Sequence, residues 1–219
     1  MTDANPALAT EQATSAEIGA TYTTGSFVLE GAVFRTQLDD AVANVTLASG
    51  PITLPGIGFV PAGGEGRRRL NVDRSRIDGA SLSLRWTANA AWTLSANYGW
   101  SDSTVERADV APALVGRRFA QAPRHTAVAG LTWNPAAKVT ANARVRWMGE
   151  QFEDDLNTLR LASATVVDLM LEFRTSASTR LQLSAENLLD ARIETGRSSS
   201  GLVNLGTPRL VLIGFRFER

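Results

Sequence analysis

Hydrophobic and polar residues alternate along most of the chain, most clearly between His125 and Met148. Residues 125–133 lead through a short turn at 134–137 into a second segment at 138–148. One face of that second segment carries Val139, Ala141, Ala143, Val145 and Trp147, and the other carries Lys138, Thr140, Asn142, Arg144 and Arg146. This period of two predicts a β-hairpin with an apolar and a polar face. A soluble antiparallel sheet and a membrane barrel both contain such strands.

Alternating segments recur through the chain, whereas no segment shows a convincing helical period. We therefore expect an all-β, antiparallel fold of about nine strands. The pattern does not fix the register of residues 26–44. The expected strands are 16–22, 26 to about 42, about 69–87, 91 to about 105, 125–133, 138–148, about 163–174, 179–188 and 209–217.

The connections between these strands alternate strictly in length. Short ones lie at 23–25, 88–90, 134–137 and 175–178, and long ones at about 44–68, 106–124, 149–162 and 190–208. A soluble sandwich has no reason to sort its loops in this way, whereas outer-membrane barrels have short periplasmic turns and long outer loops. The sequence therefore favours a transmembrane β-barrel segment at 16–219, with 1–15 as the remnant of an extracellular loop and Arg219 on the periplasmic side.

Large aromatic residues gather near the short turns and near the chain end. All of them except Phe27, whose face is uncertain, lie on the apolar face of their strands, as in a belt at a membrane interface. Trp92 and Trp100 are eight residues apart, or roughly 20 Å of depth in a tilted strand. A second belt is therefore expected at the other interface. The predicted interface residues are Tyr22, Trp86, Trp92, Trp100, Trp133, Trp147, Phe173, Phe215 and Phe217.

Composition narrows the class of protein. The charges balance at 22 basic and 22 acidic residues, so we expect no nucleic-acid partner, and without cysteine there is no disulfide framework. Met1 to Pro6 lacks the pattern of a signal peptide, and no apolar run is long enough for a transmembrane helix. Nine strands with ends on opposite sides cannot form a complete bacterial barrel, which has an even strand count. We expect the C-terminal part of a larger barrel.

Several short motifs, in this order, resemble TonB-dependent outer-membrane receptors. They are Asn5-Pro6-Ala7-Leu8 with Glu11 and Glu17-Ile18-Gly19, Arg118 with Pro123-Arg124-His125, Glu186-Asn187-Leu188-Leu189-Asp190, Gly206-Thr207-Pro208-Arg209, and the aromatic last strand. The resemblance implies the last nine strands of a 22-stranded barrel and energised uptake of a scarce solute such as a ferric siderophore. The family's plug domain and TonB-contacting segment have no counterpart here, so the TonB system would act only through a missing N-terminal plug region. Glu218 and Arg219 follow Phe217, whereas the family usually ends on an aromatic residue.

Candidate chemistry is sparse. His125 is the only histidine, and without a G-x-S-x-G stretch it is better interpreted as an ordinary residue at a strand start than as part of a hydrolase. The acidic stretch Glu153-Asp154-Asp155 has oxygen ligands that suit calcium, although a solvated acidic loop is the simpler interpretation. We therefore expect no enzyme activity, no cofactor and no metal site.

A basic group lies where the second long loop enters the third strand. Guanidinium groups suit anionic chelates or lipopolysaccharide phosphates, and a rim of solvated charges is the alternative interpretation. The candidate substrate-binding residues are Arg67, Arg68, Arg69, Arg74 and Arg76. We expect a receptor in the outer membrane of a Gram-negative bacterium, in contact with lipid and an extracellular small molecule. A soluble all-β binding or adhesin domain and a passive pore remain the alternatives.

Overall fold

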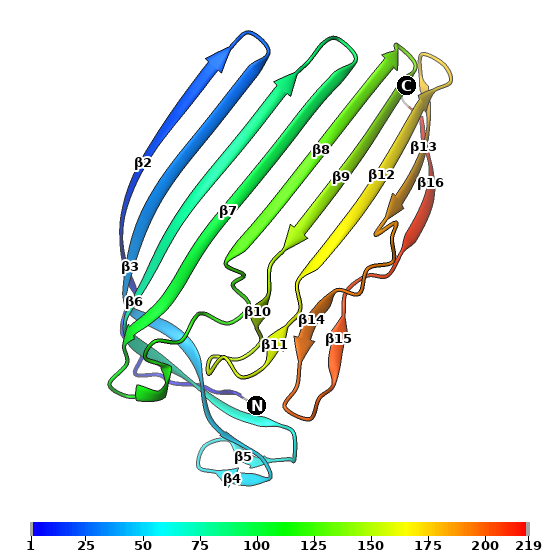
Figure 1. The fold of residues 1–219 in the computed structure, drawn as a ribbon. Coiled ribbons are helices and arrows are strands. Elements are labelled where there is room, and N and C mark those ends of the chain that lie inside the picture. The colour runs from blue at the N-terminus through cyan, green and yellow to red at the C-terminus, as the bar shows by residue number, and fades with distance from the viewer. Residues whose placement is uncertain (1, 218–219) are drawn as a thin grey trace.

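The computed structural model describes residues 2–217, which form a strongly curved antiparallel sheet (Figure 1). Its long strands are β2 (Gln12–Thr24), β3 (Phe27–Ser49), β6 (Glu65–Thr87), β7 (Trp92–Arg107), β8 (His125–Ala136), β9 (Val139–Met148), β12 (Ala164–Arg174), β13 (Thr179–Glu186) and β16 (Leu210–Phe217). They neighbour one another in the order β16-β13-β12-β9-β8-β7-β6-β3-β2. The expected nine strands are therefore confirmed. The position expected for Arg219 lies outside the described residues.

The long connections contain short strands. β4 (Ile52–Leu54) pairs with β5 (Gly58–Val60), β10 (Gln151–Phe152) with β11 (Arg160–Leu161), and β14 (Glu194–Arg197) with β15 (Val203–Leu205). β1 (Thr2–Asp3) runs parallel to β6, and a 3₁₀ turn, η1, covers Pro112–Leu114. No helix among the described residues is long and apolar enough to span a membrane.

Two strands are longer than the alternation indicated. β3 and β6 have 23 residues each and stay paired from Phe27 opposite Trp86 to Ser49 opposite Glu65. The long loop expected at about 44–68 is therefore mostly a continuing ribbon that ends in the β4–β5 hairpin. β2 likewise begins at Gln12 rather than at residue 16. The period-2 pattern fades in these extensions because they no longer separate an apolar from a polar environment.

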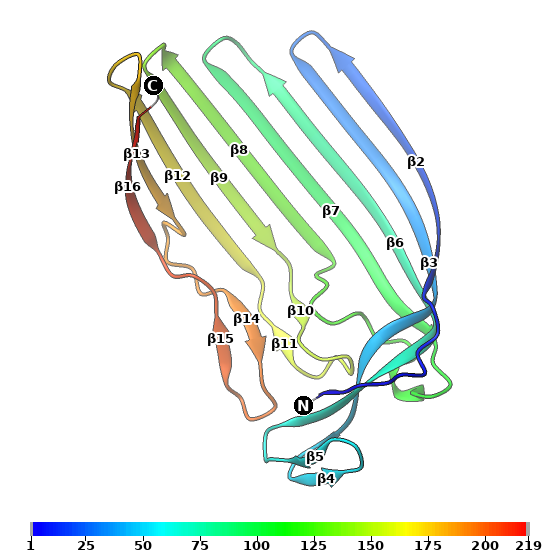
Figure 2. The ribbon, with the colours of Figure 1, turned by 180° about the vertical axis from the view of Figure 1, so that it is seen from behind.

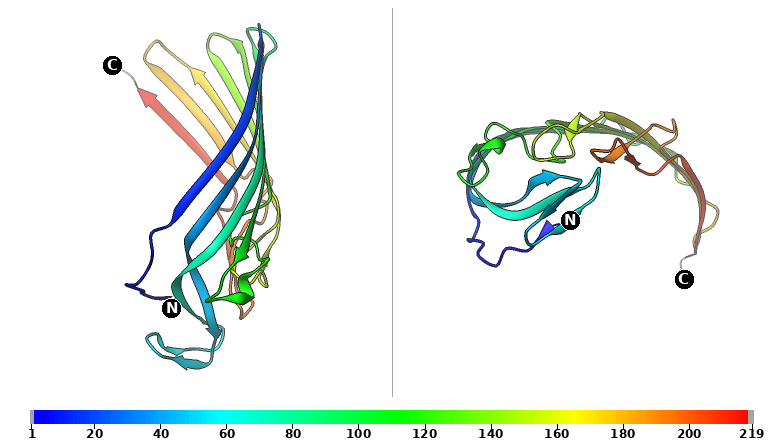
Figure 3. Two further views of the ribbon diagram at one scale, coloured as in Figure 1. Left: turned by 90° about the vertical axis from the view of Figure 1, so that its left-hand side faces the viewer. Right: turned by 90° about the horizontal axis from the view of Figure 1, so that it is seen from below.

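The sheet has the shape of part of a barrel wall. Seen along its axis, the strands follow an arc, with the N-terminal segment and the β4–β5 hairpin on the concave side (Figure 3). Within the described residues, β2 and β16 are edge strands and the barrel is not closed. All short turns lie at one end and all long connections at the other, which confirms the sorting predicted from connection length (Figures 1 and 2).

The convex face is apolar across the strands. Register rows such as Leu29–Leu84–Ala96–Ala129–Val145 run over five neighbouring strands, and the larger side chains on this face are exposed. The register settles residues 26–44, because Phe27 opposite Trp86 places Phe27 on this face as well. We call it the outward face.

The concave face of the wall is polar. Arg144 and Arg146 contact the same carboxylate of Asp168, at 3.0 and 3.1 Å, and Asp168 also accepts the backbone N–H of Asn187. Closer to the loop end, the ring of Phe34 lies over Gly79, where any side chain would collide with it. The apolar and polar faces are therefore divided as alternation predicts.

The buried core lies at the loop end rather than within the wall. It contains Val45, Val72, Val105, Ala108 and Leu114. To reach this core, β3 changes its alternation at Asp40, whose φ of 56° is in the left-handed region. Before Asp40 the inward side chains are at even positions, such as Leu38, and after it they are at odd positions, such as Val45.

Candidate solute-binding site

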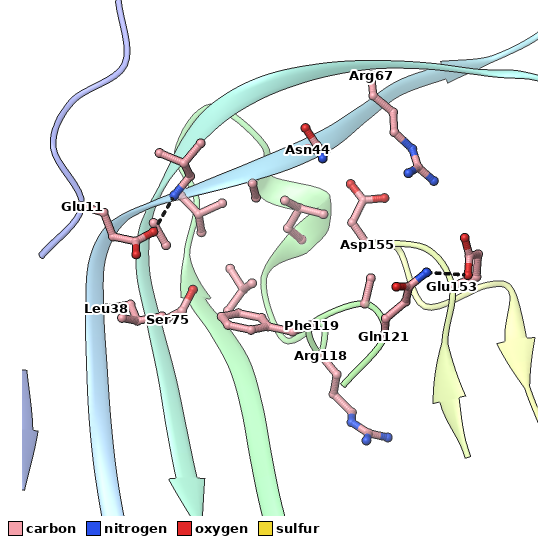
Figure 4. Close-up of a pocket in the computed structure, with 17 residues that line it drawn as sticks. Glu11, Leu38, Asn44, Arg67, Ser75, Arg118, Phe119, Gln121, Glu153 and Asp155 are labelled. Carbon is pink, nitrogen blue, oxygen red and sulfur yellow. Dashed lines mark hydrogen bonds between the residues drawn. The ribbon is translucent and has the colours of Figure 1, made fainter. Parts of the chain in front are cut away.

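A cavity of about 460 Å³ lies at the loop end, where β3 and β6 bend over the ends of β7 and two long connections (Figure 4). The connections that close it are residues 108–124, between β7 and β8, and residues 150–159, between β9 and β12. Its lining includes apolar residues of the buried core and several charged side chains. The cavity therefore has a packed inner part and a polar opening.

The inner part of the cavity contains an unsatisfied hydroxyl group. Leu38, Val105 and Phe119 surround it with carbon, and Ser75 is fully buried. The Ser75 hydroxyl is a buried side-chain oxygen for which the described residues provide no hydrogen-bond partner. A buried polar atom without a partner is unfavourable by roughly 1–3 kcal/mol, so this hydroxyl is suited to bond with a ligand or water in the cavity.

The opening of the cavity carries both signs of charge. Arg67 points into it while its Nε donates to Glu65 at 3.0 Å (Figure 4). Asp155 accepts two bonds from Thr46, one from the backbone N–H and one from the hydroxyl, both at 2.8 Å. Because Thr46 and Asp155 are 109 positions apart, this contact ties the β3–β6 ribbon to the 150–159 loop across the opening.

Arg118 lines the cavity from the 108–124 connection. Its guanidinium lies 5.6 Å from the centre of the Phe152 ring, a cation–π contact. Burial lowers the pKa of Arg118, and the nearby charge of Arg124 lowers it further. Asn157 fixes this segment in place, because its amide accepts the N–H of Arg118 at 2.7 Å and donates to the Arg118 carbonyl at 2.9 Å.

The three carboxylates of the acidic stretch point to different partners. Glu153 accepts from Gln121, and Asp155 is held by Thr46. Asp154 is buried and accepts backbone bonds from Thr158 and Leu159. Burial raises the pKa of Asp154, but these hydrogen bonds outweigh it and the pKa lies below its usual range. The described residues contain no group of three or more ligands that could hold a metal ion, and Asp154 organises the loop rather than lying in solvent.

The five arginines predicted to bind substrate do not converge. Only Arg67 lines the cavity. Arg68 lies 3.4 Å from Asp3, and Arg69 is exposed. Arg74 pairs with Asp39 at 2.9 Å, and Arg76 with Asp78 and Glu106, on the outward side of β6. Their separation follows from their places along β6, because Arg67, Arg68 and Arg69 lie in the part that bends over the loop end, whereas Arg74 and Arg76 lie in the wall beside acidic neighbours.

Sequence reasoning missed Ser75 and Phe119 as lining residues. Ser75 occupies an ordinary polar position in an alternating strand, and Phe119 lies inside a long connection with no pattern of its own. Asp155 was noticed only as one of three neighbouring carboxylates. Their proximity depends on contacts between segments far apart in the sequence, for which a single sequence carries no signal.

His125 lies on the outward face, away from this cavity. Its Nδ1 lies 2.7 Å from the Tyr98 hydroxyl, and its ring is close to those of Tyr98 and Trp147. His125 does stand at the start of β8, and its interpretation as an ordinary residue stays a prediction.

The predicted interface aromatics all lie on the outward face. Trp92 and Trp133 stack with their ring centres 5.5 Å apart near the short turns, whereas Trp100 and Trp147 lie toward the loop end. The structure thus shows two levels of aromatic side chains, and their contact with a membrane interface stays a prediction.

Comparison with known proteins agrees with this architecture. The model of the family described as TonB dependent receptor-like, beta-barrel matches residues 1–188. The protein named probable TonB-dependent siderophore receptor PiuA, from Acinetobacter baumannii, is 23% identical over 157 residues, which are 68% of this chain and 21% of that protein. The crystal structure of PiuA superimposes with a TM-score of 0.73 at 21% identity, covering 94% of this chain and 28% of that one.

Two further solved structures show the same fold. The ferric yersiniabactin uptake receptor FyuA from Yersinia pestis has a TM-score of 0.74 at 19% identity over 94% of this chain and 30% of its own. The copper transporter OprC has a TM-score of 0.73 at 16% identity over 95% of this chain and 31% of its own. The chain thus spans less than a third of the length of these relatives.

Proposed function

Because the chain belongs to the TonB-dependent receptor-like β-barrel family, we propose that it forms part of the barrel of an outer-membrane receptor that takes up a scarce solute such as a ferric siderophore. One observation carries this proposal: a curved sheet that is apolar outside and polar inside has all of its long connections at one end, where two of them close a cavity beneath the β3–β6 ribbon. Such a wall suits hydrocarbon on its convex side and water on its concave side.

We propose further that the edges of β2 and β16 pair with other strands of a larger barrel. An open edge in hydrocarbon would leave a row of backbone groups without partners, at several kcal/mol each. The chain covers less than a third of the length of its relatives, which supports this arrangement. Contact with TonB would then involve parts of the receptor other than these strands.

The cavity is the proposed contact site for the solute. Arg67 and Asp155 at its opening recognise polar, oxygen-rich groups, while Phe119 and the unsatisfied Ser75 hydroxyl recognise a flat apolar group that carries a polar atom. This chemistry suits an organic chelate that carries iron as cargo better than a bare ion. PiuA is named a siderophore receptor and FyuA a ferric yersiniabactin receptor, which supports the same class.

The test is uptake of the radioactive metal, iron or copper, by cells that display the protein in the outer membrane. The probes are ferric yersiniabactin, a ferric tricatecholate and ferric citrate, with copper(II) as the bare-ion comparison. For the accepted chelate, Arg67→Gln should raise the half-saturating concentration about tenfold or more, since a hydrogen bond to a charged group contributes roughly 1.5–3 kcal/mol. Arg69→Gln is the matched control, because Arg69 is exposed and outside the cavity.

Uptake of copper alone, or equal effects of the two variants, would contradict the proposed solute site. Complete release of the protein from membranes by alkaline carbonate would contradict the receptor itself and favour a soluble binding domain. Ion conductance in planar bilayers without energised uptake would favour a passive pore.

A further inference from the structure

The end of the β3–β6 ribbon carries no charge. Residues 50–64, which we call the apolar tip, contain the β4–β5 hairpin and not one Asp, Glu, Lys or Arg, whereas each of the other three long connections contains at least four such residues. Within the apolar tip, Phe59 is 62% exposed and Ile52 is 40% exposed. Exposed apolar surface that is grouped in this way marks an interaction site. The apolar tip therefore has the composition of a docking surface.

The apolar tip is a packed unit rather than a loose loop. Val60 is 1% exposed and packs over the backbone of Gly66, where a side chain would collide with the hairpin. At the base of the tip, the Ser199 hydroxyl donates to the Gly63 carbonyl at 3.0 Å, which joins the tip to the β14–β15 hairpin. Because side chains alternate along a strand, Phe59 points to the face of the hairpin opposite to Val60. The described residues hold that face in place and leave most of it uncovered.

The apolar tip lies on the concave side of the sheet, inside the arc of the wall when the molecule is seen along its axis (Figures 1 and 3). In a barrel, hydrocarbon meets only the convex side, so lipid chains do not reach the tip. Polar side chains would suit this watery position better than Phe59 and Ile52 do. The surface that covers the tip therefore comes from within the perimeter of the barrel.

The remaining wall of the same barrel supplies an occupant in that place. Within the described residues, β2 and β16 have no outer neighbour, and the chain covers only 30% of FyuA and 28% of PiuA. Further strands that continue the proposed barrel would bring their own outer connections around the space into which the tip leads. Those connections would also keep a second copy of the chain away from the tip. Connections of the same receptor are thus the occupant that the position and the composition of the tip favour.

We propose that the apolar tip packs against apolar side chains on the outer connections of the other strands of the same barrel, so that one hydrophobic core is shared across the mouth. Phe59 is the central side chain of this chain's half of that core. Burial of apolar surface drives such a contact, and because residues 50–64 carry no charge, no charged group of the tip has to be desolvated. The inference rests on the proposed larger barrel but not on solute uptake.

The contact is tested with single cysteines in the receptor as it is assembled in the outer membrane of intact cells. Residues 1–219 contain no cysteine, so an introduced thiol is the only one in this part of the receptor. Phe59→Cys and Val110→Cys are matched, because the native side chains are 62% and 65% exposed in this chain. A membrane-impermeant maleimide should label Phe59→Cys about tenfold or more slowly than Val110→Cys, since a covered thiol reacts only when the contact opens.

Thr53→Cys is the second reporter, because Thr53 lies opposite Phe59 on the same face and its replacement leaves that ring in place. Its thiol should be protected like that of Phe59→Cys. Labelling of both tip variants at the rate of Val110→Cys, in protein that resists alkaline carbonate, would overturn the inference and leave the proposed receptor intact. Protection that appears only after a ferric chelate is added would assign the tip to the solute and overturn the inference as well. Release of the protein by carbonate would overturn both proposals.

The identity of the partner is tested with a photoreactive benzoylphenylalanine in place of Phe59. Irradiation of intact cells should link this side chain to outer connections of the same barrel that lie outside residues 1–219, and mass spectrometry of the linked peptides identifies them. A linked species of twice the receptor's mass would assign the tip to a second copy. That result would overturn the inference, as would a link to lipid or the absence of any link.

Discussion

The barrel wall and the loop end place apolar side chains in opposite directions, although β3 and β6 run through both. In the wall, Val33 is 53% exposed on the outward face, whereas twelve residues later on the same strand Val45 is 3% exposed in the buried core. The wall therefore leaves its apolar side chains uncovered, as barrel strands in a membrane do, whereas the loop end carries a core of its own, as a soluble domain does. The cavity adjoins that core, so its shape depends on packing within the loop end.

The largest expected effect comes from a charge in the core of the loop end. Val72→Asp places a carboxylate without a partner among Val45, Val105 and Leu114, which costs several kcal/mol. We expect residues 41–72 and 108–124 to become sensitive to protease, while the wall still migrates as a folded species in unheated gels. Leu47→Asp is the control, because Leu47 is 46% exposed. Unfolding of wall and loop end together would mean that the two regions are not separable.

A charge on the outward face of the wall should have the next largest effect, and only in lipid. Leu82→Arg exposes a guanidinium to hydrocarbon and should lower the free energy of unfolding in bilayers by about 2–4 kcal/mol. Ser83→Arg, one residue further along and facing the polar side, should change it by much less. Denaturant titration of both variants in vesicles measures the difference. Equal losses would show that the faces are assigned wrongly.

A smaller effect is expected from the tight contact on the concave face. Gly79→Ala would press a methyl group into the Phe34 ring, and overpacking of this kind costs about 1–3 kcal/mol. Adding Phe34→Leu should recover most of the lost stability in the same denaturant titration. If the double variant is no more stable than Gly79→Ala, the ring is not the cause.

The smallest effect should come from the buried carboxylate of the 150–159 loop. The pKa of Asp154 is lower in the folded protein than in the unfolded chain, so its contribution is present above the unfolded pKa of about 3.9 and is lost as pH falls through the folded value. Asp154→Asn should lose about 1–2 kcal/mol of local stability at neutral pH, and the loss should shrink steadily as the pH falls below about 3.9. Hydrogen exchange of the 150–159 amides over a series of pH values measures this. Glu150→Gln is the control, because the Glu150 side chain is 53% exposed.

Sequence patterns predicted the wall much better than the loop end. Alternation and connection length gave all nine strands, because every wall residue faces either an apolar or a polar side and its position in the period decides which. The same rule failed beyond Asp40 and Asp73, where the alternation changes and both flanking strands continue further than expected. It also grouped Arg67 with Arg74 and Arg76, although of these three only Arg67 lines the cavity.

The cavity could not be predicted because its contacts are not local. Thr46 meets Asp155 and Arg118 meets Asn157, and each pair joins segments that lie far apart in the sequence. Glu153 and Phe119 lie in long connections without a periodic pattern, so the sequence does not indicate where their side chains point. Only the acidic stretch at 153–155 attracted attention, and there the side chains diverge.

The left-handed backbone at Asp40 has a consequence for how the loop end can vary. Since the side chains swap faces at that residue and opposite it near Asp73, residues 41–72 can be exchanged as a unit without altering which residues of the wall face outward. A graft of 41–72 from a relative would bring its own core contacts and its own charged groups to an unchanged wall. The variable part of the ribbon and the constant part are thereby separated at two facing positions.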